Sequence, residues 1–189
     1  MIPGEIALDW GMMSVVKEYQ DEAQSLEREA FLVRYKIPFL IRKKEIDSAD
    51  PRNEYRSTLK MKVDREKREV RVEPSPPSPM DSVVRLEKSD RNSFHAKILV
   101  GRTETNDVVI PHLTVSKHHA FLKENPENDC YCVTDTGSTN GTKLNGQALT
   151  AREPRDLSDG DELAFGDISF TFYTPGGFYD LLMSISALR

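Results

Sequence analysis

Apolar residues recur at steps of three and four near the start of the chain. Val16, Tyr19, Ala23, Leu26 and Ala30 follow this spacing, which predicts an amphipathic helix over roughly residues 14–30. An apolar stripe of this kind needs a surface to pack against.

Further along, apolar residues alternate with charged ones on both sides of a charged segment at 64–67. Leu59, Met61 and Val63 precede it, and Val70 and Val72 follow it. The alternation predicts two short strands joined by a turn. Too few apolar residues lie in this part for an independent core.

A proline-rich segment marks the clearest boundary. Residues 73–79 read Glu-Pro-Ser-Pro-Pro-Ser-Pro, and this density of proline excludes helix and favours an extended spacer. We therefore divide the chain into an N-terminal extension of mixed helical and irregular structure over 1–73, a linker over 74–81, and a folded region that follows.

After the linker, short apolar runs alternate with turn residues at roughly ten-residue spacing, which predicts an antiparallel β-sandwich. The candidate strands are 83–87, 95–100, 108–110, 119–123, 131–135, 143–145, 162–165 and 168–173.

The pattern changes again at Thr174-Pro175, which can cap and begin a helix. The apolar residues beyond it lie on one helical face, namely Phe178, Leu181, Leu182, Ile185 and Leu188. We expect this C-terminal helix, over 176–189, to pack on the sandwich.

Composition and charge exclude several classes of protein. The chain has 189 residues, 38% hydrophobic and 30% charged, with a net charge of −5, and an acidic chain is a poor ligand for nucleic acid. No apolar run approaches the length of a membrane span, and the first residues do not resemble a secretory signal, so a cytoplasmic location is expected. Cys130 and Cys132 fall two apart in a predicted strand, which points them to opposite faces and makes a disulfide between them implausible. No metal-ligand spacing is found, and no cofactor is expected.

Four sequence blocks are more specific than their turns require. The first three are Gly101-Arg102, residues 116–120 (Ser-Lys-His-His-Ala) and residues 135–146 (Asp-Thr-Gly-Ser-Thr-Asn-Gly-Thr-Lys-Leu-Asn-Gly). The fourth comprises residues 157–163 (Leu-Ser-Asp-Gly-Asp-Glu-Leu) with Phe165-Gly166. In identity, order and spacing the blocks resemble the forkhead-associated (FHA) domain family over about residues 82–175.

The resemblance implies a mainly β fold, an eleven-stranded antiparallel β-sandwich of the SMAD/FHA type. It also implies that loops at one end of the sheets bind phosphothreonine peptides. Matching positions assign phosphate binding to Arg102, Ser116 and Lys117. At Ser116, the hydroxyl and a loop amide are expected to donate hydrogen bonds to the phosphate oxygens. Thr139 closes the pocket, and Asn140 holds the peptide backbone beside the phosphothreonine.

Other matched positions are expected to support the binding loops. His119 matches a histidine that braces them from below, and Gly101 and Gly141 serve backbone geometry. Peptide selectivity beyond the phosphothreonine is expected to depend on Thr114, Lys143 and other loop residues.

The predicted function is that of an adaptor in Ser/Thr-kinase signalling, with a phosphothreonine-containing kinase or kinase substrate as partner. Catalysis is disfavoured, because the glycine-rich stretch lacks the Gly-Lys-Ser/Thr of a P-loop and no nucleophile motif is present. The alternative is a phosphate-independent assembly module of the scaffold or secretion-system type. Self-association through the N-terminal helix is a further option.

Overall fold

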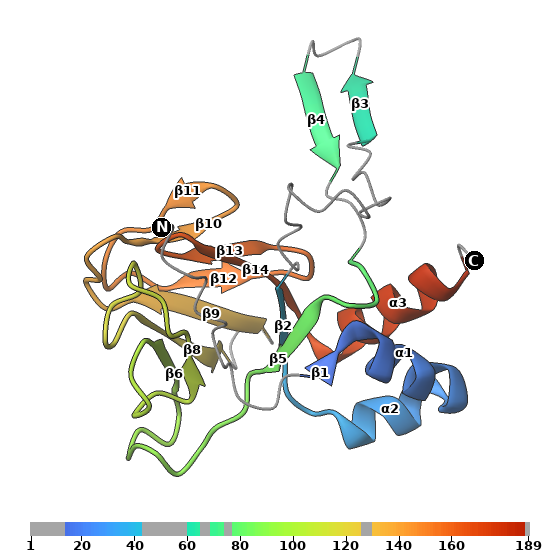
Figure 1. Cartoon of the computed structure of the whole chain (residues 1–189), viewed down its shortest axis with the longest axis horizontal. Helices are drawn as coiled ribbons and strands as arrows, with labels where there is room; N and C mark the ends of the chain where they lie inside the picture. Colours follow the sequence, from blue (N-terminus) through green and yellow to red (C-terminus); the bar gives the residue numbers. More distant parts are fainter. Residues whose placement is uncertain (1–13, 43–59, 65–68, 74–76, 126–129, 188–189) are drawn as a thin grey trace, which may run out of the picture.

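Two β-sheets face each other in the protein (Figure 1). The structure, a computed structural model, describes residues 14–42, 60–64, 69–73, 77–125 and 130–187. The first sheet has seven strands in the order β1-β5-β2-β14-β13-β10-β11, and the second has five in the order β12-β9-β8-β6-β7. All neighbouring strands are antiparallel except β6 and β7, which are parallel. The sandwich predicted from the sequence is confirmed.

The strands of the seven-stranded sheet are β1 (Ser14–Val15), β2 (Phe39–Arg42), β5 (Ser82–Arg85), β10 (Thr142–Leu144), β11 (Gln147–Ala148), β13 (Glu162–Phe165) and β14 (Ile168–Tyr173). Those of the five-stranded sheet are β6 (Ile98–Gly101), β7 (Val108–Val109), β8 (Ala120–Asn125), β9 (Cys130–Asp135) and β12 (Arg155–Leu157). Each of the eight strands predicted after the linker is present, with ends shifted by up to three residues. The two sheets together hold twelve strands among the described residues, close to the expected eleven.

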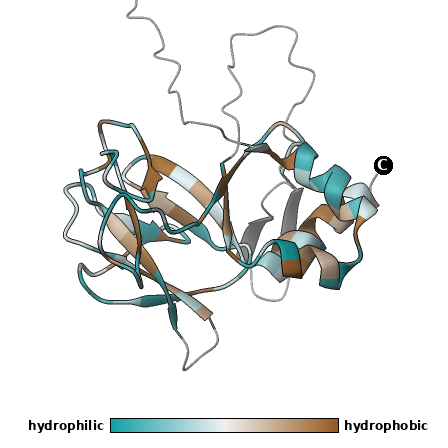
Figure 2. Cartoon of the chain, turned by 90° about the horizontal axis from the view of Figure 1, so that it is seen from below, coloured by the Kyte–Doolittle hydropathy of each residue, from teal (hydrophilic) through white to brown (hydrophobic). Residues whose placement is uncertain are grey.

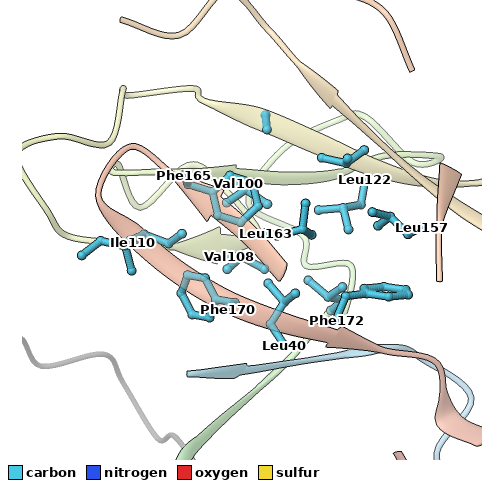
Figure 3. Packing of buried hydrophobic residues seen from close by; sticks show 14 of the residues in the cluster. Leu40, Val100, Val108, Ile110, Leu122, Leu157, Leu163, Phe165, Phe170 and Phe172 are labelled. Atoms are coloured by element: carbon cyan, nitrogen blue, oxygen red, sulfur yellow. The ribbon is translucent and has the colours of Figure 1, made fainter. Parts of the chain in front are cut away.

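The core of the sandwich follows from alternation along the strands. In β14, Ile168, Phe170 and Phe172 are buried, whereas Ser169 is exposed and Thr171 is only partly covered. Because successive side chains of a strand point to opposite faces, one face of β14 enters the core. Figure 3 shows Phe170 and Phe172 in one cluster with residues of the opposite sheet, such as Val100 and Leu122.

Strand β2 lies inside the sandwich although it precedes the proline-rich segment. It pairs with β5 on one side and with β14 on the other. Leu40 joins the core between the sheets, while Phe39 and Ile41 face a second apolar cluster beneath the helices. Since β2 is covered on both faces, it reads as a continuous apolar run and lacks the alternation that marks a half-exposed strand.

Three helices pack together beside the sheets (Figure 2). They are α1 (Val16–Ser25), α2 (Arg28–Arg34) and α3 (Pro175–Ser186). The single helix predicted over roughly 14–30 is therefore wrong in its extent, because the backbone becomes extended at Leu26 and Glu27. Helix α3 begins as predicted, with the Thr174 hydroxyl accepting a hydrogen bond of 3.1 Å from the Gly177 amide.

Aromatic rings fill the space between the helices and the sheet. Phe178 of α3 contacts Phe39 of β2, with ring centroids 4.4 Å apart, and lies edge-on to Tyr19 of α1 at 5.3 Å. Val16 and Ala23 belong to the same buried cluster. The apolar stripe of α1 thus has its partner surface within the chain and is not free to form a dimer interface.

The structure also refines the division of the chain. The predicted extension over 1–73 contributes β1 and β2 to the sandwich and α1 and α2 to the helical layer. The two strands expected near 59–72 are present as β3 (Lys60–Asp64) and β4 (Glu69–Glu73), which form a separate antiparallel pair. Part of the linker, residues 74–76, lies outside the described residues.

Two further expectations concern cysteine and the membrane. Cys132 is buried, Cys130 is partly exposed, and no disulfide joins them. Within the described ranges, no helix combines the length and apolar character needed to cross a bilayer.

Candidate functional site

Three loops meet at the end of the sandwich away from the helices. They connect β6 to β7 (residues 102–107), β7 to β8 (110–119) and β9 to β10 (136–141). Between them lies an open cavity of about 270 Å³. Its lining residues are Arg102, Leu113, Thr114, Val115, Ser116, Lys117, Thr139 and Asn140. All five residues predicted to contact a phosphopeptide are thus brought to one cavity from three separate segments.

The cavity is cationic although the chain is acidic. Two of its lining side chains, Arg102 and Lys117, are basic, three carry hydroxyl groups, and none is a carboxylate. Among the residues that the structure describes, neither cation forms an ion pair. A guanidinium and an ammonium group without acidic partners are suited to hold an anion.

Ser116 and Thr139 join two of the loops at the cavity wall. The Ser116 hydroxyl accepts a hydrogen bond of 3.0 Å from the Thr139 amide and lies 3.4 Å from the Thr139 hydroxyl. The second contact is long for two hydroxyl groups, so the Ser116 proton can turn to a better acceptor.

Asn140 is oriented by the neighbouring loop. Its amide nitrogen donates to the carbonyl of Thr114 at 2.8 Å. Because a carbonyl can only accept, this contact fixes which end of the Asn140 amide faces the protein. The side-chain oxygen is left to accept a hydrogen bond from a ligand.

His119 lies fully buried under the cavity. Its Nδ1 accepts from the Ser116 amide at 3.0 Å, and its Nε2 lies 3.1 Å from the Gly141 carbonyl. Since a backbone amide is always a donor, the proton of the neutral ring must sit on Nε2 and be donated to Gly141. Burial lowers the pKa of His119, against the opposing effects of the Gly141 carbonyl and Asp135. The ring therefore stays neutral and joins both loops. The Ser116 amide is thus engaged by His119, whereas no partner is found among the described residues for the next amide, that of Lys117.

Asp135 shapes the loop that carries Thr139 and Asn140. Its carboxylate accepts from the amides of Gly137 and Ser138 at 2.7 and 2.9 Å and from the hydroxyls of Ser138 and Thr142 at 2.6 and 2.7 Å. Burial would raise the pKa of Asp135, but these hydrogen bonds outweigh it and lower the pKa. The ionised carboxylate thus holds the start of the loop to β10.

Asn106 ties the Arg102 loop to the Ser116 loop. Its fully buried amide donates to the carbonyls of Thr103 and Lys117, both at 2.7 Å. The backbones come so close here that a side chain at Gly101 would place its first carbon 2.3 Å from the Lys117 carbonyl oxygen. Only glycine fits at position 101.

Asp107 anchors the end of the same loop. Its buried carboxylate accepts from Lys88 at 2.8 Å, from the Ser89 hydroxyl at 2.7 Å and from the Leu99 amide at 2.7 Å. Burial would raise the pKa of Asp107, yet Lys88 and the backbone donors lower it to about 2.

The structural roles of Asn106 and Asp135 were not assigned from the sequence. Asn106 reads as part of a turn, and Asp135 as the first residue of the glycine-rich block. Both residue types bond readily to nearby backbone, which was the available signal. Thr114 lines the cavity, whereas Lys143, the other residue considered for selectivity, is exposed on β10 and does not.

With this geometry in view, comparison with known proteins identifies the class of domain. The FHA domain model matches residues 98–166, from β6 through β13 and into the turn that precedes β14. The resemblance to the FHA domain family is thus confirmed over this segment of the chain.

Several relatives share this segment. An oxoglutarate dehydrogenase inhibitor of Corynebacterium jeikeium is 39% identical over 75 residues, which cover 38% of this chain and 46% of the relative. The transcriptional regulatory protein EmbR of Mycobacterium tuberculosis is 33% identical over 78 residues, 41% of this chain and 19% of EmbR. This chain therefore spans less than half the length of these curated relatives.

Solved structures include the same segment. The structure of EmbR in complex with a low-affinity phosphopeptide is 30% identical, with a TM-score of 0.38 and coverage of 42% of this chain and 20% of that one. The FHA domain of an Arabidopsis thaliana hypothetical protein is also 30% identical, with a TM-score of 0.39 and coverage of 42% and 67%.

Proposed function

We propose that this protein is a non-catalytic adaptor that binds a phosphothreonine-containing peptide in the cavity between its three loops. The observation that carries the proposal is the cationic cavity itself, in which three hydroxyl groups converge without a carboxylate on two basic side chains that form no ion pair with any described residue. A phosphate group with about two negative charges and three acceptor oxygens needs such a set of converging donors.

Arg102 is the principal phosphate ligand. Its planar guanidinium can donate two parallel hydrogen bonds to one phosphate, and this geometry is not available to lysine. Lys117 adds a second positive charge, and its backbone amide, which has no partner among the described residues, can donate a hydrogen bond to the phosphate. The Ser116 hydroxyl turns from Thr139 to a phosphate oxygen.

Asn140 and Thr139 hold the rest of the peptide. The free oxygen of the Asn140 side chain accepts from a peptide amide, while its nitrogen remains on Thr114. Thr139 closes the cavity from the third loop.

The buried polar groups below the cavity make binding efficient. His119, Asn106 and Asp135 hold the loops in place before a ligand arrives, so less conformational entropy is lost on binding. Gly101 and Gly141 permit the backbone paths that these contacts require, Gly101 by close approach and Gly141 at a φ of +75°.

The names of two relatives support a regulatory role for this chain. They include a transcriptional regulator and an enzyme inhibitor, and EmbR has been solved with a phosphopeptide. We extend phosphopeptide binding to this chain and propose a Ser/Thr kinase, or a substrate of one, as the partner. The cytoplasmic location expected from the sequence remains a prediction.

Fluorescence anisotropy with degenerate peptide libraries tests the proposal. Matched libraries carry phosphothreonine, phosphoserine or unmodified threonine at the fixed position. We expect binding of the phosphothreonine library and none of the unmodified one. Equal binding of the unmodified library would reject the proposal and favour the phosphate-independent assembly module.

A further inference from the structure

One residue near the proposed binding site has a backbone conformation that its residue type does not favour. Arg152 has a φ of +69°, in the left-handed region that residues with a side chain rarely adopt. It is the third residue of a β-turn closed by the Glu153 amide, which donates to the Thr150 carbonyl at 3.3 Å. Glycine is favoured at a turn position with positive φ, so the turn itself gives no reason for an arginine.

The loop that contains Arg152 joins β11 to β12 (residues 149–154) and lies against the third loop of the cavity. The Arg152 amide donates to the Asp135 carbonyl at 2.8 Å, where the third loop begins. The Leu149 amide donates to the Thr142 carbonyl at 2.9 Å, where the third loop ends. The Arg152 turn is thus fixed on the flank of a loop that the proposed ligand contacts.

Contacts continue from this flank toward the cavity. Thr136 follows Asp135, and its hydroxyl donates to the His118 carbonyl at 3.0 Å. His118 in turn is next in sequence to the cavity residue Lys117. An extended peptide advances about 3.3 Å per residue, so a ligand of ordinary length can reach from the cavity to the Arg152 turn.

Arg152 is also a cation without an acidic partner. Its side chain is exposed, and it forms no ion pair with any residue that the structure describes, the adjacent Glu153 included. A guanidinium of this kind can donate two parallel hydrogen bonds to a carboxylate or to a phosphate. In a chain with a net charge of −5, Arg152 therefore extends the positive potential of the cavity along the third loop.

We infer that Arg152 binds a second anionic group of the phosphothreonine ligand, beside the third loop. The group is a carboxylate or a further phosphate, since both present the paired oxygens that a guanidinium binds. The inference rests on the proposed function, because it requires the peptide to occupy the cavity. It also accounts for the unfavourable φ, since a strained residue is retained where its side chain serves the ligand and not the turn.

The test uses phosphothreonine peptides that are otherwise rich in alanine. One series carries glutamate at successive positions on either side of the phosphothreonine, and a second series carries phosphoserine at the same positions. Anisotropy gives the affinity of each peptide relative to the alanine peptide for the wild type, Arg152→Gln, Arg152→Gly and Lys36→Ala. Lys36 is the control, because it is an exposed cation that precedes β2 at the helical end and forms no ion pair with a described residue.

Glutamate at one position should strengthen wild-type binding about twofold to fivefold, as expected for an exposed ion pair, and phosphoserine should strengthen it more. Arg152→Gln and Arg152→Gly should lose the gain from glutamate, whereas Lys36→Ala should retain it. Because glycine adopts positive φ freely, Arg152→Gly should melt no lower than the wild type, which separates loss of the charge from damage to the turn. A gain from phosphoserine alone, lost in both Arg152 variants, would support the inference with phosphate as the bound group.

Two results would overturn the inference while phosphothreonine binding stays intact. Neither acidic series could bind more tightly than the alanine peptide at any position, or the gain could persist in both Arg152 variants. A wild-type protein that binds none of the phosphothreonine peptides would instead reject the proposed function, and the inference with it.

Discussion

The two ends of the sandwich are built on different physical principles. At the loop end, exposed polar and basic side chains stand over a buried polar network made by Asn106, His119 and Asp135. At the helical end, Phe178 and Phe39 pack in a cluster of aromatic and aliphatic side chains. Strand β14 connects the ends, since the turn before it bonds to Thr114 and helix α3 follows its last residue.

The contrast separates binding from stability. Exposed cavity residues such as Lys117 contribute little to folding, so they are free to be selected for their ligand. The apolar residues of the helical end contribute to folding and touch no part of the cavity. The buried polar residues at the loop end contribute to both binding and stability. They hold the binding loops in place, and loss of one partner would leave a buried polar group without a hydrogen bond.

Removal of the central ring at the helical end should have the largest effect. Phe178→Ala leaves a cavity among Tyr19, Phe31 and Phe39 and is expected to lower the free energy of unfolding by about 3–5 kcal/mol. Chemical denaturation measures the loss. Met183→Ala, on the more exposed side of the same helix, serves as the control. Phosphopeptide affinity measured well below the melting temperature should not change, and a large loss of affinity would mean that the two ends are coupled.

Replacement of His119 should affect both properties. His119→Ala leaves the Ser116 amide without a partner and removes one of two donors to the Gly141 carbonyl, the other being the Gly166 amide, which we expect to cost about 1–3 kcal/mol of stability and to weaken peptide binding. Thermal melting and anisotropy are measured on the same samples, with the exposed His95→Ala as a matched control. An unchanged melting temperature would contradict the role of His119 in bracing the loops.

Acid should weaken the loop end through Asp107. Its pKa is about 2 in the folded protein against the usual 3.8, so at pH 3 the unfolded chain binds a proton that the folded protein does not. This carboxylate contributes roughly 2 kcal/mol above about pH 5, and the contribution is lost as the pH falls through 4 toward 2.

Denaturation curves between pH 2 and 6 check this expectation. Asp107→Asn should be less stable than the wild type at pH 6 and should lose less stability on acidification. The control is Asp90→Asn, in the exposed part of the neighbouring loop. Parallel pH profiles for wild type and Asp107→Asn would show that another group governs acid sensitivity.

The smallest expected effect concerns the phosphorylated residue itself. Family resemblance predicts a preference for phosphothreonine over phosphoserine, because the threonine methyl can enter a small apolar recess worth roughly 0.8 kcal/mol. Paired peptides that differ by this methyl group measure the preference directly. Equal affinity would mean that the cavity does not sense the methyl group.

Local pattern was sufficient to predict much of the fold. Half-exposed strands such as β14 alternate clearly, and Thr174-Pro175 marks the start of α3 without ambiguity. Strand β2 was missed because both its faces are buried and because its neighbours, β5 and β14, lie far away in sequence. The interruption between α1 and α2 was missed because Leu26 continues the apolar spacing through a backbone that is extended.

The residues of the candidate site likewise fall into a group that the sequence predicts and a group that it does not. Arg102, Ser116, Lys117, Thr139 and Asn140 were found because they stand in compact blocks with a recognisable order, and the structure brings them to one cavity. Asn106 and Asp135 act through hydrogen bonds to backbone groups. The spacing of residues along the chain carries little information about such contacts.

The most direct test of the account is the affinity of Arg102→Ala for a phosphothreonine peptide, measured together with its melting temperature. Loss of hydrogen bonds to a charged group predicts binding weaker by about 1.5–3 kcal/mol with unchanged stability, and Arg102→Lys should restore only part of the loss. A stable Arg102→Ala protein that binds the phosphopeptide as tightly as the wild type would contradict the account.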